Sequence, residues 1–136
     1  MIAAIRKIVV PTIRELEFSG SFPNFHRIRE TQIDLLAFQF FSYGGSFIVE
    51  IAYCPPEGLT TADGKHFPPK KVRIYHIHLK NRLRLGAFPP LTDHWFSYEP
   101  ERAGIYEDTA LDVLPFLRSQ AESFWRTHER MIVPVK

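Results

Sequence analysis

The chain has 136 residues, of which 45% are hydrophobic and 14% aromatic, so it can bury one sizeable core and is far too apolar to be disordered. Its 17 basic and 15 acidic residues give a net charge of +2. This balance excludes a generally basic binder of nucleic acids or membrane surfaces, and any basic site must be local. We expect one domain over residues 1–136.

The single cysteine, Cys54, cannot form an internal disulfide, which fits a reducing compartment and excludes a cysteine-cluster zinc site. Residues 1–10 are largely apolar, but Arg6 and Lys7 interrupt them and no small-residue cleavage site follows, so we expect no signal peptide. No uncharged apolar run approaches the ~18 to 20 residues of a membrane span. These features predict a cytoplasmic protein that makes no membrane contact.

The first predicted element is a helix, because apolar residues recur at helical spacing near the N-terminus, namely Ile2, Ile5, Ile8, Val9, Ile13 and Leu16. Pro11 removes one backbone donor and should kink or split this helix. Ser19-Gly20 is expected to end it.

Three strand-like segments rich in Phe, Ile, Val and Tyr follow, over residues 25–30, 32–41 and 47–53. In the third, alternate residues share one face: Phe47, Val49, Ile51 and Tyr53. Tyr43-Gly44-Gly45-Ser46 is typical of a hairpin turn, so the second and third strands should pair antiparallel.

Residues 54–71 are rich in Pro and Gly and predict a long loop, a place to look for a functional site. Residues 72–85 alternate, which predicts a fourth strand with a break near Asn81. Its apolar face would carry Tyr75, Ile77, Leu79, Leu83 and Leu85, and its basic face His76, His78, Lys80, Arg82 and Arg84.

A second irregular segment covers residues 86–104, and its Trp95, Phe96 and Tyr98 are expected to fold back onto the core. Residues 106–131 have helical periodicity and predict a second helix, bent near Pro115. The predicted fold is therefore α+β: a four-stranded antiparallel sheet with the N-terminal and C-terminal helices packed on one face.

Four short stretches resemble a known family: Phe38-Gln39, Arg82-Leu83-Arg84-Leu85-Gly86, Asp93-His94-Trp95-Phe96 and, in the C-terminal helix, Phe124-Trp125. Taken together, these stretches make the chain similar to the bacterial domain-of-unknown-function family 4304. Phe96 departs from the second Trp that the family often has there, and residues 17–20 imitate its helix-ending turn only loosely. The resemblance implies a fold and a bacterial source, with no activity and no catalytic residues.

The sharpest chemical feature is His76-x-His78, since residues two apart on a strand can hold one metal together. A metal-assisted or phosphoryl-handling enzyme would need a third ligand, from among His66, His94, Asp93 and Glu50. The simpler interpretation is a polar strand face on which Lys80 and Arg82 oppose a cation, and we prefer it. We therefore predict neither a metal nor another cofactor.

The basic face of the fourth strand, with Arg27 and Arg29 of the first, is a candidate phosphate or nucleic-acid surface. Neighbouring acids would instead make it an ordinary solvated face, namely Glu30, Asp34 and Glu50. Since the net charge is nearly neutral, nucleic-acid binding is the less favoured interpretation.

The candidate binding residues are Arg82, Arg84, Asp93, Trp95, His76 and His78. An arginine and Asp93 are expected to pair and to pin the second irregular segment to the sheet. Cys54 is interpreted as an apolar residue at a strand end, since nothing near it lowers a thiol pKa. The leading hypothesis is a non-enzymatic protein-binding domain with a regulatory or immunity role, its oligomeric state open.

Overall fold

The computed structural model describes the backbone of residues 1–132 and the side chains of residues 1–127. The N-terminal helical segment consists of α1 (Ile2–Ala4), a π-helical turn (Ile5–Val9) and α2 (Val10–Glu15). The first strands are β1 (Ser19–Ser21), β2 (Asn24–Ile28), β3 (Ile33–Phe40) and β4 (Ser46–Cys54). Short strands follow: β5 (Leu59–Thr60), β6 (His66–Phe67), β7 (Arg82–Arg84) and β8 (Phe96–Ser97). The chain ends in α3 (Ile105–Phe116), a second π-helical turn (Leu117–Ala121) and α4 (Glu122–Ile132).

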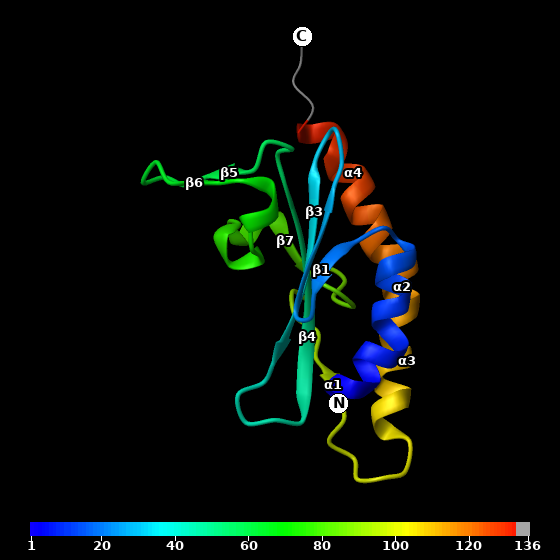
Figure 1. Ribbon diagram of the computed structural model, residues 1–136. Helices are drawn as coiled ribbons and strands as arrows, with labels where there is room; N and C mark the ends of the chain where they lie inside the picture. The colour runs from blue at the N-terminus through cyan, green and yellow to red at the C-terminus, as the bar shows by residue number, and fades with distance from the viewer. Residues whose placement is uncertain (133–136) are drawn as a thin grey trace.

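One antiparallel sheet organises the molecule, in the order β1-β2-β3-β4-β7, with β8 also paired to β4. Both helical segments lie along the same side of this sheet (Figure 1). The α+β class and the one-sided packing of the helices are thereby confirmed. The three strands predicted over residues 25–53 are present to within two residues at each end. The expected hairpin turn, at residues 41–45, joins β3 to β4.

The N-terminal helix is split near Pro11, as expected, because Pro11 is the second residue of α2, which begins directly after the π-helical turn. It ends earlier than predicted. Glu17 takes a left-handed conformation with φ of 71°, and the amides of Glu17 and Phe18 donate to the carbonyls of Arg14 and Ile13. This is a Schellman cap, in which the left-handed residue is a glutamate instead of the usual glycine.

The main core lies between the helices and the sheet. Phe47, Val49 and Ile51 face it from β4, as the alternation predicted, and the C-terminal helical segment contributes the fully buried Trp125. That segment departs from regular α-helix directly after Pro115, since the π-helical turn begins at Leu117. No helix in the described part of the chain is long and apolar enough to cross a bilayer.

A polar cluster also lies on the helix side of the sheet. Asp34 is fully buried and pairs with Arg27 at 2.7 Å and with Arg29 at 3.0 Å. Arg27 also reaches Glu122 at 3.0 Å, which ties the sheet to α4. Burial raises the pKa of Asp34, and the two guanidiniums counter that effect. The prediction that Arg27 and Arg29 extend an exposed basic face is therefore wrong.

The fourth predicted strand is mostly wrong. Residues 69–81 form three 3₁₀-helical turns, and only Arg82–Arg84 are strand. Three residues of this stretch are buried: Val72, Ile74 and Ile77. They cover part of the sheet face opposite the helices, where they form a second cluster with Ile33, Leu35, Ala52 and Cys54. Tyr75 and Leu79, predicted to face the core, are each 72% exposed.

The loop expected over residues 54–71 contains the small hairpin of β5 and β6. Its turn is closed by backbone hydrogen bonds from Thr61 N to Lys65 O and from Gly64 N to Thr61 O. The hairpin projects from the side of the sheet opposite the helices (Figure 1). We call this side the open face.

Candidate functional site

Two arginines reach the open face from β7, which pairs with β4 so that Arg84 lies opposite Glu50 and Arg82 opposite Ala52. Side chains alternate along a strand, so Leu83 between them turns towards the core, against which it packs. Arg82 and Arg84 are thereby held side by side on the open face, half-buried.

Glu50 joins the two arginines. One of its carboxylate oxygens lies 3.3 Å from Nη1 of Arg82 and the other 3.5 Å from Nε of Arg84. Arg82 is fixed further by a 2.8 Å hydrogen bond from its Nε to the carbonyl of Ile77. Because Glu50 is itself buried, this pairing orients both guanidiniums firmly.

Asp93 is the second partner of Arg84, at 2.5 Å. Its other carboxylate oxygen accepts a 3.1 Å hydrogen bond from Nε1 of Trp95, and the Arg84 guanidinium lies 5.9 Å from the Trp95 ring centre. The hydrogen bond from Arg84 lowers the pKa of Asp93, with a smaller effect from Trp95. The arginine–aspartate pair expected from the sequence is present, and it joins the second irregular segment to the sheet.

Behind this network, the backbone at residues 86–87 is clamped by Gln120. The side-chain oxygen of Gln120 accepts from Gly86 N at 2.6 Å, and its nitrogen donates to Ala87 O at 2.7 Å. Gly86 has a φ of 92°, and a Cβ there would lie only 2.8 Å from Cγ of His94. The close approach of Gly86 to the His94 ring therefore holds the residue next to Asp93 against the segment that follows β7.

A groove of about 540 Å³ runs beside the network, lined by Glu50, Arg82, Arg84 and Asp93 together with apolar side chains. The apolar lining includes Leu79 and Leu91, and Leu91 is 68% exposed. Aliphatic side chains exposed around paired arginines are a composition found at binding surfaces.

An aromatic cluster adjoins the groove through Trp95. The ring of Phe41 lies 5.7 Å from that of Trp95 and 5.5 Å from that of Tyr43, and all three residues are exposed. The expectation that Trp95 folds back onto the core is wrong, because its neighbour Phe96 pairs with β4 and takes the core side, stacked on Phe47. Tyr98 does pack against the core, as expected.

His76 and His78 do not share a strand face, since each lies in or beside a separate 3₁₀ turn. Nδ1 of His76 accepts a hydrogen bond from Arg73 N at 3.0 Å, and Nδ1 of His78 accepts one from Lys80 N at 3.2 Å. A ring that accepts at Nδ1 carries its proton at Nε2, so neither neutral ring has a free lone pair for a metal.

No group of three or more His, Cys, Asp or Glu side chains within the described residues is arranged to hold a metal ion. Both histidines line a second groove of about 630 Å³ between β4 and the β5–β6 hairpin, together with Tyr53, Thr60 and Asn81. Tyr53 donates to Asn81 there at 3.1 Å.

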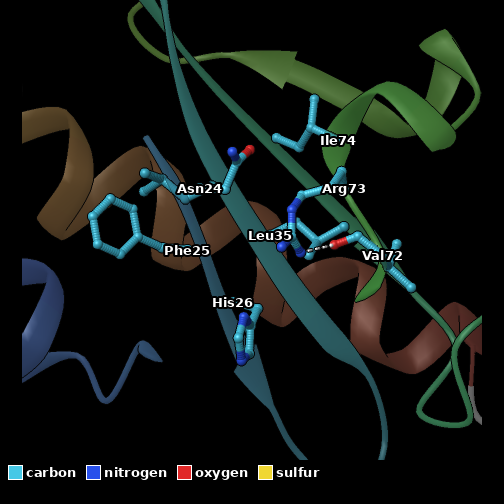
Figure 2. Close-up of a pocket in the computed structure, with 8 residues that line it drawn as sticks. Asn24, Phe25, His26, Leu35, Val72, Arg73 and Ile74 are labelled. Carbon is cyan, nitrogen blue, oxygen red and sulfur yellow. Dashed lines mark hydrogen bonds between the residues drawn. The ribbon is translucent and has the colours of Figure 1, made fainter. Parts of the chain in front are cut away.

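A third hollow lies between β2, β3 and residues 72–74 (Figure 2). His26 and Leu35 line it from the sheet, and Arg73 lies across it, with its guanidinium donating to Val72 O at 3.2 Å. Its volume of about 10 Å³ is that of a single water, so it is too small for a ligand.

Cys54 is the last residue of β4 and is buried, as interpreted from the sequence. Burial raises the pKa of its thiol to about 12, with smaller effects from Asp34 and Glu57. A thiol of this kind is not a nucleophile near neutral pH.

Sequence reasoning missed two residues that build the site. Glu50 was considered only as a general counter-charge or ligand, although its place in β4 opposite Arg84 makes it the joint partner of both arginines. Gln120 gave no signal, because a glutamine in an amphipathic helix is usually solvated; its inward position follows from the π-helical turn that contains it.

The chain belongs to the DUF4304 family, a domain of unknown function, whose family pattern matches residues 9–127. No match was found among curated proteins or among solved structures. Of the family-like stretches, residues 82–86 and 93–96 are the two that meet around Arg84, Gly86 and Asp93.

Proposed function

We propose that this DUF4304 domain is a non-enzymatic protein-binding module that engages its partner through the open face around Arg82, Arg84, Asp93 and Trp95. The observation that supports the proposal is the groove beside these residues, where oriented arginines adjoin exposed Leu79, Leu91 and an aromatic cluster. Arginine, tryptophan and tyrosine are the side chains that most often contribute the binding energy of protein interfaces.

The arginines are suited to recognition because their geometry is set before a partner arrives. Two partners hold each arginine: the Ile77 carbonyl and Glu50 hold Arg82, and Glu50 and Asp93 hold Arg84. Side chains that are already ordered lose less conformational entropy on binding. We also propose a regulatory or immunity role and a cytoplasmic location. The free, buried thiol of Cys54 is consistent with the reducing environment of the cytoplasm.

The enzymatic alternative has less support. Its starting point was a shared strand face for His76 and His78, which the 3₁₀ turns do not provide. The lining of the groove beside Arg84 includes no histidine, cysteine or serine. The binding module is therefore the function that the geometry supports best.

Site-specific photocrosslinking in the cells that encode the protein tests the proposal. A photoreactive phenylalanine analogue placed at Leu91 should give one discrete adduct, and Arg84→Ala in the same chain should abolish it. The matched control is the analogue at Leu111, which is 50% exposed on α3 and lies away from the groove. Equal yields of adduct at Leu91 and Leu111, or an adduct at Leu91 that persists in Arg84→Ala, would refute the proposal.

A further inference from the structure

The basic residues of this chain are unevenly distributed. Residues 64–92 contain seven of the 17 lysines and arginines and none of the 15 acidic residues. They are Lys65, Lys70, Lys71, Arg73, Lys80, Arg82 and Arg84. The near-zero net charge of the chain conceals this concentration, since the remaining residues are net acidic.

The fold gathers this stretch on one side of the molecule. From β6 through the three 3₁₀ turns to β7, the chain lies on the open face, away from the helices (Figure 1). Lys65, Lys70, Lys71 and Lys80 are exposed there. Within the described side chains, Lys70, Lys71 and Lys80 have no acidic partner within ion-pair distance.

Two histidines respond to these charges. The pKa of His26 is lowered by burial and then by the nearby charges of Arg73 and Lys70. The pKa of His76 is lowered by burial and then by Arg73 and Lys65. The charges of Arg73, Lys70 and Lys65 therefore reach these two histidines of the open face.

Of the three acids that were expected to balance this face, Glu30, Asp34 and Glu50, the last two are paired with arginines. Asp34 is buried on the helix side with Arg27. Glu50 and Asp93 lie on the open face, but both are engaged by Arg82 and Arg84. The basic residues that line the groove with the aliphatic rim are Lys80, Arg82 and Arg84.

We infer that the partner presents an acidic segment carrying a large aliphatic side chain, which inserts in the groove lined by Leu79 and Leu91 while its carboxylates face Lys70, Lys71 and Lys80. This inference rests on the proposed function and names the chemistry of the partner. A protein segment fits this surface better than a nucleic acid, because Leu79 and Leu91 are exposed at the groove and can bury a large aliphatic side chain, which a nucleic acid lacks.

Fluorescence anisotropy with the full chain and defined probes tests the inference. The probes are labelled peptides of alternating Glu and Leu, of Glu and Ser, and of Lys and Leu, and an oligothymidylate. The Glu–Leu peptide should bind, more weakly as NaCl rises. The Glu–Ser peptide should bind about tenfold more weakly or worse, the affinity that one buried leucine contributes. The Lys–Leu peptide should not bind.

Paired charge reversals provide the control. Lys70→Glu with Lys71→Glu should slow association of the Glu–Leu peptide by about tenfold or more, since charge steering raises association rates by roughly 10 to 10³. Arg6→Glu with Lys7→Glu makes the same change in net charge on the N-terminal helical segment, where both residues are exposed, and should leave the rate nearly unchanged.

The inference is overturned if the Glu–Leu peptide does not bind, if the Lys–Leu peptide binds equally well, if both reversals have the same effect, or if oligothymidylate binds more tightly than the peptide. A discrete, Arg84-dependent adduct at Leu91 together with any of these results would mean that the module has a partner of other chemistry. Failure of both experiments would remove the proposed function as well.

Discussion

Gly86→Ala should destabilise the protein strongly, because this glycine meets two separate constraints. Its φ of 92° costs an L-residue about 1–2 kcal/mol. The added Cβ would also lie 2.8 Å from Cγ of His94, and His94 is confined by the rings of Phe96 and Phe116. Forcing an extra carbon into such packing costs about 1–3 kcal/mol. The expected loss is therefore about 2–5 kcal/mol of unfolding free energy.

Gly64→Ala is the matched control, since Gly64 has a similar φ of 86° but nothing within 4 Å of its Cβ position. Urea unfolding followed by circular dichroism measures both variants. Gly64→Ala should lose no more than the backbone cost of about 1–2 kcal/mol. If Gly86→Ala were no less stable than Gly64→Ala, the close packing of Gly86 on His94 would be refuted, and with it the stated reason for the position of Asp93.

Three further predictions concern single groups. Gln120→Ala should cost about 1–3 kcal/mol in urea unfolding, because the Gly86 amide and the buried Ala87 carbonyl lose their partner; a loss below about 0.5 kcal/mol would contradict the clamp. Asp93→Asn should be slightly less stable than the wild type near pH 7, by less than about 1 kcal/mol because Asp93 is half exposed. Since its folded pKa is lowered, that difference should be present above the unfolded value of about 3.9 and vanish as the pH falls through the folded pKa; a difference that persists at lower pH would argue against the ion pair. Burial raises the pKa of Cys54 to about 12, whereas the unfolded thiol has an ordinary pKa of about 8.5. Cys54 should therefore react with a disulfide reagent at pH 8 at least about 10² times more slowly in the native than in the urea-unfolded protein, since its scarcer thiolate outweighs its greater nucleophilicity; rates within tenfold of each other would disprove its burial.

The strands between residues 24 and 54 could be predicted because local and global signals agree there. Alternation, β-branched and aromatic residues and the Gly44-Gly45 turn all favour one antiparallel pairing, which β3 and β4 adopt. The same holds for the two helical segments and for the interruptions near Pro11 and Pro115.

Residues 72–85 do not form the predicted strand, because an alternating pattern does not require one. The buried side chains are Val72, Ile74 and Ile77, and that spacing belongs to successive 3₁₀ turns laid across a sheet. The alternation of apolar and polar residues along one segment does not depend on whether a neighbouring strand has a free edge for pairing. Here β4 pairs only with residues 82–84 of the stretch, so the rest is excluded from the ladder.

Part of the candidate site, the pair of Arg84 and Asp93, could be predicted from the sequence, whereas the roles of Glu50 and Gln120 could not. Arg84 and Asp93 are separated by a short irregular segment, so their pairing could be anticipated. The role of Glu50 depends on the register of β4 against β7, and that of Gln120 on a π-helical turn, and neither is encoded in local spacing. The side on which Trp95 lies was likewise set by the pairing of β8 with β4.

The central claim is that the open face around Arg84 and Trp95 binds another protein. The most direct test is quantitative mass spectrometry of proteins that copurify with the chain at its natural expression level, compared among Arg84→Ala, Trp95→Ala and the control Arg102→Ala. Arg102 forms a similar exposed ion pair, with Asp108 at 2.8 Å, away from the groove. We predict a stoichiometric partner that both open-face variants lose and the control retains. A partner retained by all three folded variants, or lost equally from all three, would contradict the account.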